Sequence, residues 1–561
     1  MTVSTLQRPK IDLKPHVLLT MACAAFILLL LVYPLGRMLW QVVVAGDLGA
    51  AFSVFSQPWF AEVFLNTAIV VLVSTLLAVS TGALLAWVNE RTDASLGPVG
   101  SLIPIIPLLI PNVALSIGWV FIAAPLVGFL NGLLTALPDW MSFQVNIYSW
   151  AGLIFVYTIN GVPLVYLVVA AALKNLDPAL EEASRINGAG LLRTLRMVSG
   201  PAVKPALFAA GLLVTINGLG LYSIPAVIAT TARIDVLTTR IVALLNRDFP
   251  PRMAEAQMLG VVMLLTVGIL WYFQTRSTRS GQFATIGGRA AGNSKLALGG
   301  WKWPARLATI GYLASTSLVP ILALLTVSLQ PYWTPNVNFA VLGFGNFVNV
   351  IHVNRLTASA LGNSLALSSM GALIAMAIAI VVAINTVDRK SILALGTDAA
   401  ITSSAAIPHL ILAVGFLVAF SGAPFFLSGT ALMLLLAFVV MYIPPGSIAA
   451  TSALAQIGRD LREASYTSGA SEGATVRKIV IPLAVPGFVA GWAIIFVHMM
   501  GDLSAAALLS GINNPVIGFA ILAIWETGTF GVLAAFSMIL CVINIAVIGA
   551  MMGVGKLFSR C

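Results

Sequence analysis

The sequence EASRING occupies residues 182–188, and EASYTSG occupies residues 463–469, 281 positions later. From residue 180 to residue 210 the first copy aligns with the second without a gap, and Pro201 matches Pro482 near the end of this alignment. A repeat of this length indicates that one supersecondary unit occurs twice. Both copies are polar, whereas most of the surrounding chain is hydrophobic.

The composition predicts an all-α polytopic membrane protein. Hydrophobic residues make up 59% of the 561 residues, charged residues only 9%, and the mean hydropathy is +1.01, whereas soluble domains carry roughly 25% charged residues. A helix needs about 20 apolar residues to cross a hydrocarbon core about 30 Å thick. Such runs recur about twelve times, near residues 17–38, 64–88, 98–125, 147–173, 204–229, 256–274, 305–328, 362–385, 395–421, 430–454, 484–508 and 532–555.

The distribution of basic residues predicts the orientation. If the N-terminal tail, residues 1–16, is cytoplasmic, the first run is a retained signal anchor and the C-terminus is cytoplasmic as well. The opposite orientation would reverse the positive-inside bias. The net charge of +10 is therefore explained by topology, and nucleic-acid binding is not expected. Only six of the 29 basic residues then lie outside: Arg37, Arg233, Arg240, Arg247, Arg252 and Arg355.

The repeat extends beyond the polar motif and divides the chain into two units. Residues 110–112, Ile-Pro-Asn, match residues 407–409, Ile-Pro-His, at an offset of 297. We predict six-helix units at residues 17–274 and 305–561 with the same orientation, because an even number of spans separates them. Residues 275–304 contain glycine and arginine but no acid, which predicts a solvated cytoplasmic linker.

The polar stretches are too charged to enter the membrane. We expect each to form a short cytoplasmic helix against the bundle, within residues 176–200 and 457–481. Gly188 and Gly469 fall in the middle of these helices, where glycine costs about 1 kcal/mol relative to alanine, so they are expected to mark a tight turn or a close backbone approach to a partner. A plain amphipathic interfacial helix is the alternative, but it does not explain the shared spacing.

Glu-Ala-x-x-x-x-Gly followed by proline resembles the coupling motif of ATP-binding-cassette (ABC) importer permeases. In that family the motif forms a helix that docks in a groove of the ATPase subunit. The resemblance implies two tandem six-helix type I importer permease units in a bacterial plasma (inner) membrane. The usual motif has alanine at its third position, where both copies here have serine. The residues implied in ATPase coupling are Glu182, Ala183, Ser184, Gly188, Pro201, Glu463, Ala464, Ser465, Gly469 and Pro482.

The same resemblance implies partners and a substrate. Two copies of an ABC ATPase subunit and an extracytoplasmic substrate-binding protein are expected to bind the chain, with ATP on the ATPase and no cofactor, metal or catalytic residue here. The fused halves resemble the ferric-iron-type branch, as do the segments Ile-Pro-Ala at residues 224–226 and Asp-Leu-Ser at residues 502–504. This branch implies ferric iron, with thiamine, 2-aminoethylphosphonate or polyamines as alternatives.

Signals for other chemistries are few. The stretch most similar to a nucleotide-binding Walker loop, residues 549–556, lacks the required spacing, and Leu557 replaces the required Ser or Thr. The three cysteines and four histidines show no metal-ligand spacing. A secondary transporter is the alternative class, but such a protein would not need the polar motif twice.

Polar groups within the spans suggest a pathway. A charge at the centre of a span costs about 2.5–3.5 kcal/mol, so it needs a partner or an aqueous lining. The spacing of His498 and Asp502 predicts that they share one face of the eleventh helix, near its external end, where they line the route or clamp helices together. Prolines that break matched helices also indicate the pathway. The candidate residues are Pro111, Asn112, Pro408, His409, His498 and Asp502.

Overall fold

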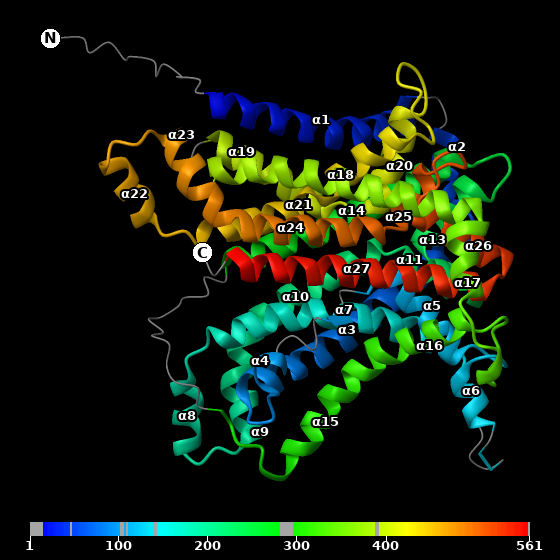
Figure 1. The fold of residues 1–561 in the computed structure, drawn as a ribbon, viewed down its shortest axis with the longest axis horizontal. Helices are drawn as coiled ribbons and strands as arrows, with labels where there is room; N and C mark the ends of the chain where they lie inside the picture. Colours follow the sequence, from blue (N-terminus) through cyan, green and yellow to red (C-terminus); the bar gives the residue numbers. More distant parts are fainter. Residues whose placement is uncertain are drawn as a thin grey trace.

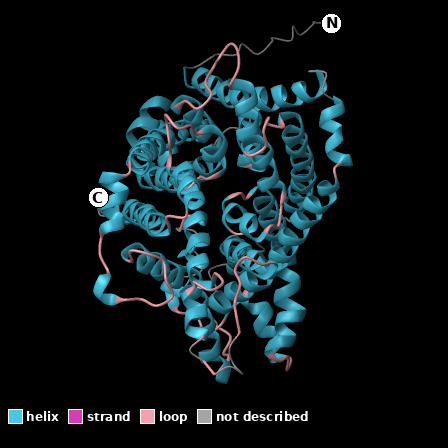
Figure 2. Cartoon of the chain, turned by 90° about the vertical axis from the view of Figure 1, so that its right-hand side faces the viewer, coloured by secondary structure: helices cyan, strands magenta, loops and turns pink. Residues whose placement is uncertain are grey.

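The chain folds into a bundle of helices that run between two ends of the molecule (Figure 1). The computed structural model describes residues 15–44, 48–100, 106–107, 110–135, 137–138, 143–280, 295–386 and 392–558. Every named element in these segments is a helix, and Figure 2 shows many of them along their axes. This confirms the all-α class.

Within the described residues, ten helices are long and apolar enough to cross a membrane. They match ten of the twelve predicted runs. The other two, the third and the ninth, are interrupted next to Pro111 and Pro408, where α5 (Asn112–Ala123) and α20 (His409–Phe420) begin. Proline lacks a backbone N–H and disfavours helical backbone at the residue before it, so each of these two runs is divided near its middle.

The long helices of the first half include the first, second, fourth, fifth and sixth predicted runs, and the second half has their counterparts. Their bounds are α1 (Pro15–Val44), α3 (Pro58–Arg91), α7 (Trp150–Lys174), α10 (Gly200–Gly220), α14 (Met253–Ser280), α15 and α16 (Lys302–Leu313 and Val319–Leu329), α18 (Arg355–Thr386), α21 (Ala431–Ala455), α24 (Ile481–Met500) and α27 (Phe530–Phe558).

Three of the prolines that lie inside helical segments follow a π turn. A π turn ends two residues before each of Pro201, Pro320 and Pro482, at residues 195–199, 314–318 and 476–480. The wider turn accommodates a ring that would clash with the carbonyl four residues back. The helix therefore runs through Pro201 and Pro482, whereas the sequence suggested that a new membrane helix starts there.

The first long helix of each half packs against the other half. Helix α1 lies against α18 and α20, and α16 lies against α5. At both crossings a proline meets a glycine: a Cβ built on Gly118 would lie 2.8 Å from Pro320 Cβ, and one built on Gly415 would lie 3.3 Å from Pro34 Cβ. Small residues let helix backbones approach closely in membranes, so these contacts join the halves.

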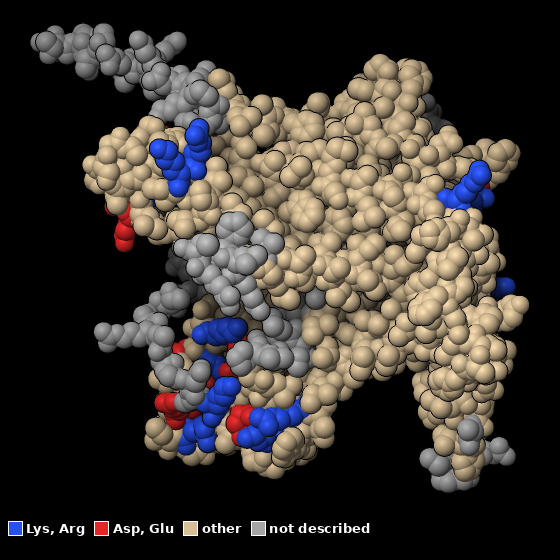
Figure 3. Space-filling model, in the orientation of Figure 1, with Lys and Arg blue, Asp and Glu red and all other residues tan. Residues whose placement is uncertain are grey.

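Charged side chains gather at the two ends of the bundle, while its middle shows almost none on the face in Figure 3. This distribution fits a bundle whose apolar belt faces lipid. Helix α1 begins and α27 ends at the left of Figure 1. Helices α8 (Pro178–Ile186) and α22 (Arg459–Thr467), which contain the repeated motif, lie at the same end. We call this end the motif end.

The last part of the predicted linker packs against the first half; residues 281–294 lie outside the described residues. Leu296 is buried, its N–H donates to Arg91 O at 2.8 Å, and its carbonyl accepts from Asp93 N at 3.0 Å. The Asp93 carboxylate accepts a hydrogen bond from Leu298 N at 3.0 Å, and this bond is the main cause of the lowered pKa of Asp93. The segment from Lys295 therefore docks beside the end of α3.

Candidate functional site

Helices α8 and α22 carry the repeated motif, one in each half, at the motif end (Figure 1). Asp177 caps the start of α8 by accepting from Ala179 N at 2.9 Å, and Pro178 takes the first helical position, where a missing N–H costs nothing. Glu182 and Glu463 are exposed. Each helix therefore presents its motif acid to solvent and to any partner that docks there.

Gly188 and Gly469 end these helices rather than lying in their middle as predicted. Their φ angles are +81° and +83°, in the left-handed region that glycine adopts without a Cβ penalty. Gly188 N donates to Arg185 O at 2.9 Å and Ala189 N donates to Ser184 O at 3.1 Å, which is the Schellman pattern. The second copy repeats both bonds.

The predicted tight turn is thus present at both glycines. A Cβ built on either glycine would meet no atom of this chain within 4 Å. The left-handed φ accounts for glycine at these positions, because other residues adopt it at a cost of roughly 1–2 kcal/mol, and the close backbone approach to a partner stays a prediction.

The serine at the third motif position has a partner in both copies. Ser184 Oγ lies 3.0 Å from Thr194 Oγ1, and Ser465 Oγ lies 2.8 Å from Thr475 Oγ1. Both threonines follow the turn, in α9 (Leu191–Thr194) and α23 (Glu472–Thr475). Each pair therefore ties the motif helix to the start of the following long helix, which explains why Ser and Thr occur together in both halves.

Charged residues anchor the two motif helices differently. In the first half Glu181 accepts from Ser199 Oγ at 2.5 Å and lies 3.8 Å from the Arg91 guanidinium, and both charged side chains are buried. In the second half Arg462 occupies the position that matches Glu181, and its guanidinium donates to Leu454 O at 3.2 Å. Sequence analysis did not single out Glu181 or Arg91. The only signal for Glu181 was an acid before the first motif where the second has Arg462, and Arg91 carried no such signal.

A cavity of about 280 Å³ lies between the halves, at the level of the two interrupted helices. Asn160 and Tyr442, near the midpoints of α7 and α21, both line it, so it lies deep in the bundle. All six candidate pathway residues predicted from the sequence line this cavity: Pro111, Asn112, Pro408, His409, His498 and Asp502.

The two walls of the cavity differ chemically. Asn112 and Asn217 of the first half occupy the positions that match His409 and His498 of the second half. On the first wall, Asn160 Nδ2 donates to Asn112 Oδ1 at 2.6 Å. The matched positions of the repeat therefore carry amides on one wall and imidazoles on the other.

Asp502 is the centre of the second wall. Its Oδ2 accepts from Tyr442 OH at 2.6 Å and lies 3.3 Å from His409 Nδ1, while its Oδ1 accepts from Ala505 N at 2.7 Å. The carboxylate thus joins α20, α21 and the start of α25 (Ser504–Leu509). Tyr442 was missed from the sequence, where its only signal is a phenol within an apolar run.

The predicted placement of His498 and Asp502 on one helical face is wrong. Helix α24 ends at Met500, so Asp502 lies beyond it, and the two residues share the cavity rather than a helix face. Both residues lie at the end of α24 that points away from α22, at the middle level of the bundle. Glycine at position 501 provides a flexible residue at which the chain leaves the helix.

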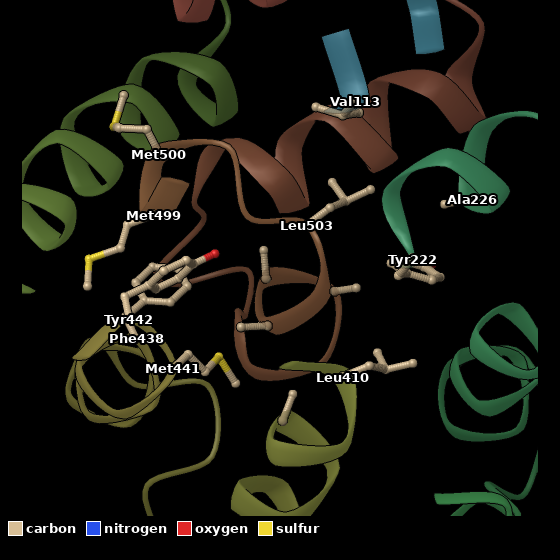
Figure 4. Packing of buried hydrophobic residues seen from close by; sticks show 14 of the residues in the cluster. Val113, Tyr222, Ala226, Leu410, Phe438, Met441, Tyr442, Met499, Met500 and Leu503 are labelled. Atoms are coloured by element: carbon tan, nitrogen blue, oxygen red, sulfur yellow. The ribbon is translucent and has the colours of Figure 1, made fainter. Parts of the chain in front are cut away.

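Beyond the helix breaks, away from the motif end, the space is filled by packed side chains. Val113 of α5 and Leu410 of α20 are at most 1% exposed and belong to one hydrophobic cluster with Leu503. Figure 4 shows Leu503 between these two residues. Toward the motif end the cavity wall continues along Leu164 and Ile216. The cavity is therefore closed on the side away from α8 and α22.

Comparison with known proteins agrees with this arrangement. The family model described as "Binding-protein-dependent transport system inner membrane component" matches residues 78–277 and again residues 371–554. The chain belongs to this family. It is thus a multi-pass inner-membrane permease, and each match covers most of one half.

Named relatives of this permease are found in several transport systems. A ferric transport system permease protein of Actinobacillus pleuropneumoniae is 24% identical over 80% of this chain and 65% of the relative. An Fe(3+)-transport system permease protein of Haemophilus influenzae is 24% identical over 87% of this chain and 88% of the relative. A spermidine/putrescine permease protein of the same species is 30% identical over 25% of this chain and 54% of the relative.

The Asp502 network gives a stability prediction. Asp502→Ala leaves the Ala505 N–H without its acceptor and His409 without its partner, and it leaves the Tyr442 hydroxyl only the longer bond to His498 O at 3.3 Å. We therefore expect a loss of about 3 kcal/mol in unfolding free energy. His498→Ala, whose side chain faces the cavity, should change stability by only about 0.5 kcal/mol. Thermal unfolding of the purified permease in detergent measures both. Equal midpoints for the two variants would contradict the clamp role of Asp502.

Proposed function

We propose that the chain is the permease subunit of an ATP-driven ABC importer and that the cavity between its halves is the alternating-access pathway. The observation that carries this proposal is the arrangement of two matched motif helices at one end and, between the halves, one cavity that is closed on the side away from these helices. Two rigid halves that rock about the cavity can expose it to either side in turn. A secondary transporter has no need for a matched pair of exposed motif helices.

The motif helices are the proposed docking points for two copies of an ABC ATPase subunit, which would bind and hydrolyse the ATP. The permease would contribute no cofactor and no catalytic residue. Their exposed acids, the left-handed turns and the Ser–Thr ties make each motif helix a fixed projection. A substrate-binding protein would dock at the opposite end.

Ferric iron is the proposed substrate. The two ferric-type relatives align with most of this chain, whereas the polyamine permease aligns with a quarter of it. Asp502 and Tyr442 place oxygen atoms on the cavity wall, and hard cations prefer oxygen ligands. A polyamine, which is also cationic, is the second candidate; thiamine and 2-aminoethylphosphonate remain further alternatives.

Uptake measurements test the substrate. Cells that express the permease with its ATPase and binding protein should accumulate radiolabelled ferric iron, and excess spermidine should not compete. Cells without the permease are the control. Uptake of labelled spermidine with no uptake of iron would replace ferric iron by a polyamine while leaving the importer class in place.

The motif helices give a prediction about assembly. The double variant Glu182→Ala/Glu463→Ala should lose ATPase binding, because a side chain central to a docking contact commonly contributes about 2 kcal/mol or more. Gly188→Val/Gly469→Val should do the same by straining the left-handed turns. Glu526→Ala, an exposed acid at the opposite end, is the control. Co-purification of the ATPase measures the effect, and full binding by both double variants would rule out docking at α8 and α22.

The proposed orientation places the motif end and both termini in the cytoplasm, since most basic residues then lie inside. On a background without native cysteines, Phe249→Cys, at a site where Phe249 is 98% exposed, should react with a membrane-impermeant thiol reagent in spheroplasts. Ser468→Cys, at an exposed position after α22, should react only in inverted vesicles. The reverse labelling would invert the topology.

A further inference from the structure

Two proline–glycine contacts join the halves at the level of the cavity. A Cβ built on Gly220, at the end of α10, would lie 2.8 Å from Pro408 Cβ. A Cβ built on Gly501, just after α24, would lie 3.1 Å from Pro111 Cβ. In each contact a residue of one half meets a residue of the other half, and all four residues line the cavity.

The two contacts are related by the internal repeat. Pro111 matches Pro408 at the offset of 297, and Gly220 matches Gly501 at the offset of 281. Each half therefore supplies the proline that begins the second part of its interrupted helix and the glycine at the end of its fourth long helix, α10 or α24. The two contacts lie at the same level of the bundle and are related by the repeat. The packed cluster beyond the cavity begins at this level.

We propose that the contacts Pro111–Gly501 and Pro408–Gly220 are the closed gate between the cavity and the end opposite α8 and α22. This proposal rests on the proposed alternating-access function and names the residues that must separate for cargo to enter. A proline ring against a glycine is held by dispersion and by excluded lipid and water, with no hydrogen bond to break. Such a contact can open and close repeatedly without leaving an unpaired polar group in the membrane.

The His409–Asp502 pair ties the second-half gate residues together. His409 follows Pro408, Asp502 follows Gly501, and their side chains lie 3.3 Å apart. At the matching positions the first half has Asn112 and Leu221, and Asn112 bonds to Asn160 instead. The second-half residues of the gate therefore move as one unit, against which the first-half residues open.

The contacts Pro34–Gly415 and Pro320–Gly118 form a natural control. They also join a proline of one half to a glycine of the other, at similar distances. However, α1 packs along several second-half helices, including α18, α19 and α20, so we expect it to move with that half. Helix α16 packs on α5 as well as on α27 of its own half, and Arg306 of the preceding α15 donates to Asp93 O of the first half, so we expect the α16–α5 crossing to stay together. A covalent link at these crossings should not prevent rocking, whereas a link at the gate should.

Disulfide trapping in the full chain tests the gate. The paired substitutions Gly220→Cys/Pro408→Cys and Gly501→Cys/Pro111→Cys place Cβ atoms slightly closer than the roughly 3.5–4.5 Å of a disulfide, and Gly118→Cys/Pro320→Cys and Gly415→Cys/Pro34→Cys do the same at the control crossings. Native cysteines are replaced, and a protease site inserted between residues 281 and 294 lets a gel show whether the cleaved halves remain linked.

Oxidation of membranes should link the halves in all four double variants. We expect transport of the proposed cargo to stop in the two linked gate variants and to return on reduction with dithiothreitol, while the linked control variants keep transporting. Transport through a linked gate, equal inhibition by the control links, or no disulfide at the gate when the controls link would each overturn the proposal. Link formation is read without any cargo, so a wrong substrate is distinguished from a wrong gate.

A second variant covers the case in which the cysteine pairs at the gate fail to fold. Pro408→Gly removes the ring from Gly220 without adding an atom, and Asn160→Cys reports access to the cavity. We expect the reporter cysteine to become reactive toward an impermeant thiol reagent from the end opposite α8 and α22 only when Pro408 is replaced. Pro320→Gly is the matched control. No gain of reactivity in Pro408→Gly would contradict the assignment.

Discussion

The structure depends on the rule that backbone polar groups within a membrane must find partners inside the protein. Long helices satisfy this rule over most of the described bundle, and the two helices interrupted at Pro111 and Pro408 meet at the cavity, where α10 and α24 also end. The backbone polar groups that lose their helical partners are concentrated there. Asparagines, histidines, a tyrosine and an aspartate surround the breaks, and the cavity that results is the deep polar site described above.

The two halves share their backbone devices more closely than their side chains. Both have the left-handed turn after the motif helix, the π turn before the proline, and the glycine at the end of the fourth long helix. The cavity walls and the anchors of the motif helices differ. Asn112 matches His409 in the repeat, and Glu181 matches Arg462. This division is physically reasonable, because the motion needs matched geometry whereas cargo recognition needs only suitable chemistry.

Much of this could be predicted from the sequence, because hydrophobicity sets the spans and an internal repeat reports its own symmetry. The motif helices, the six residues that line the cavity and the broken third and ninth runs followed from these signals. The end of α24 did not, since the apolar run continues through Leu509 and only Gly501 hints at a break. The partners of Asp502 were equally hidden. Tyr442 and His409 come from other helices, and no periodicity within one helix reports a contact between three.

The unequal cavity walls have a consequence for the ancestry of the chain. A homodimer of either half would surround the cavity with two identical walls, both amide or both imidazole, and any cargo would meet a site with true two-fold symmetry. Fusion of the halves into one polypeptide removes that restriction, because each copy of the gene segment can then change alone. An ion whose coordination shell lacks two-fold symmetry can then be held in one orientation as it passes.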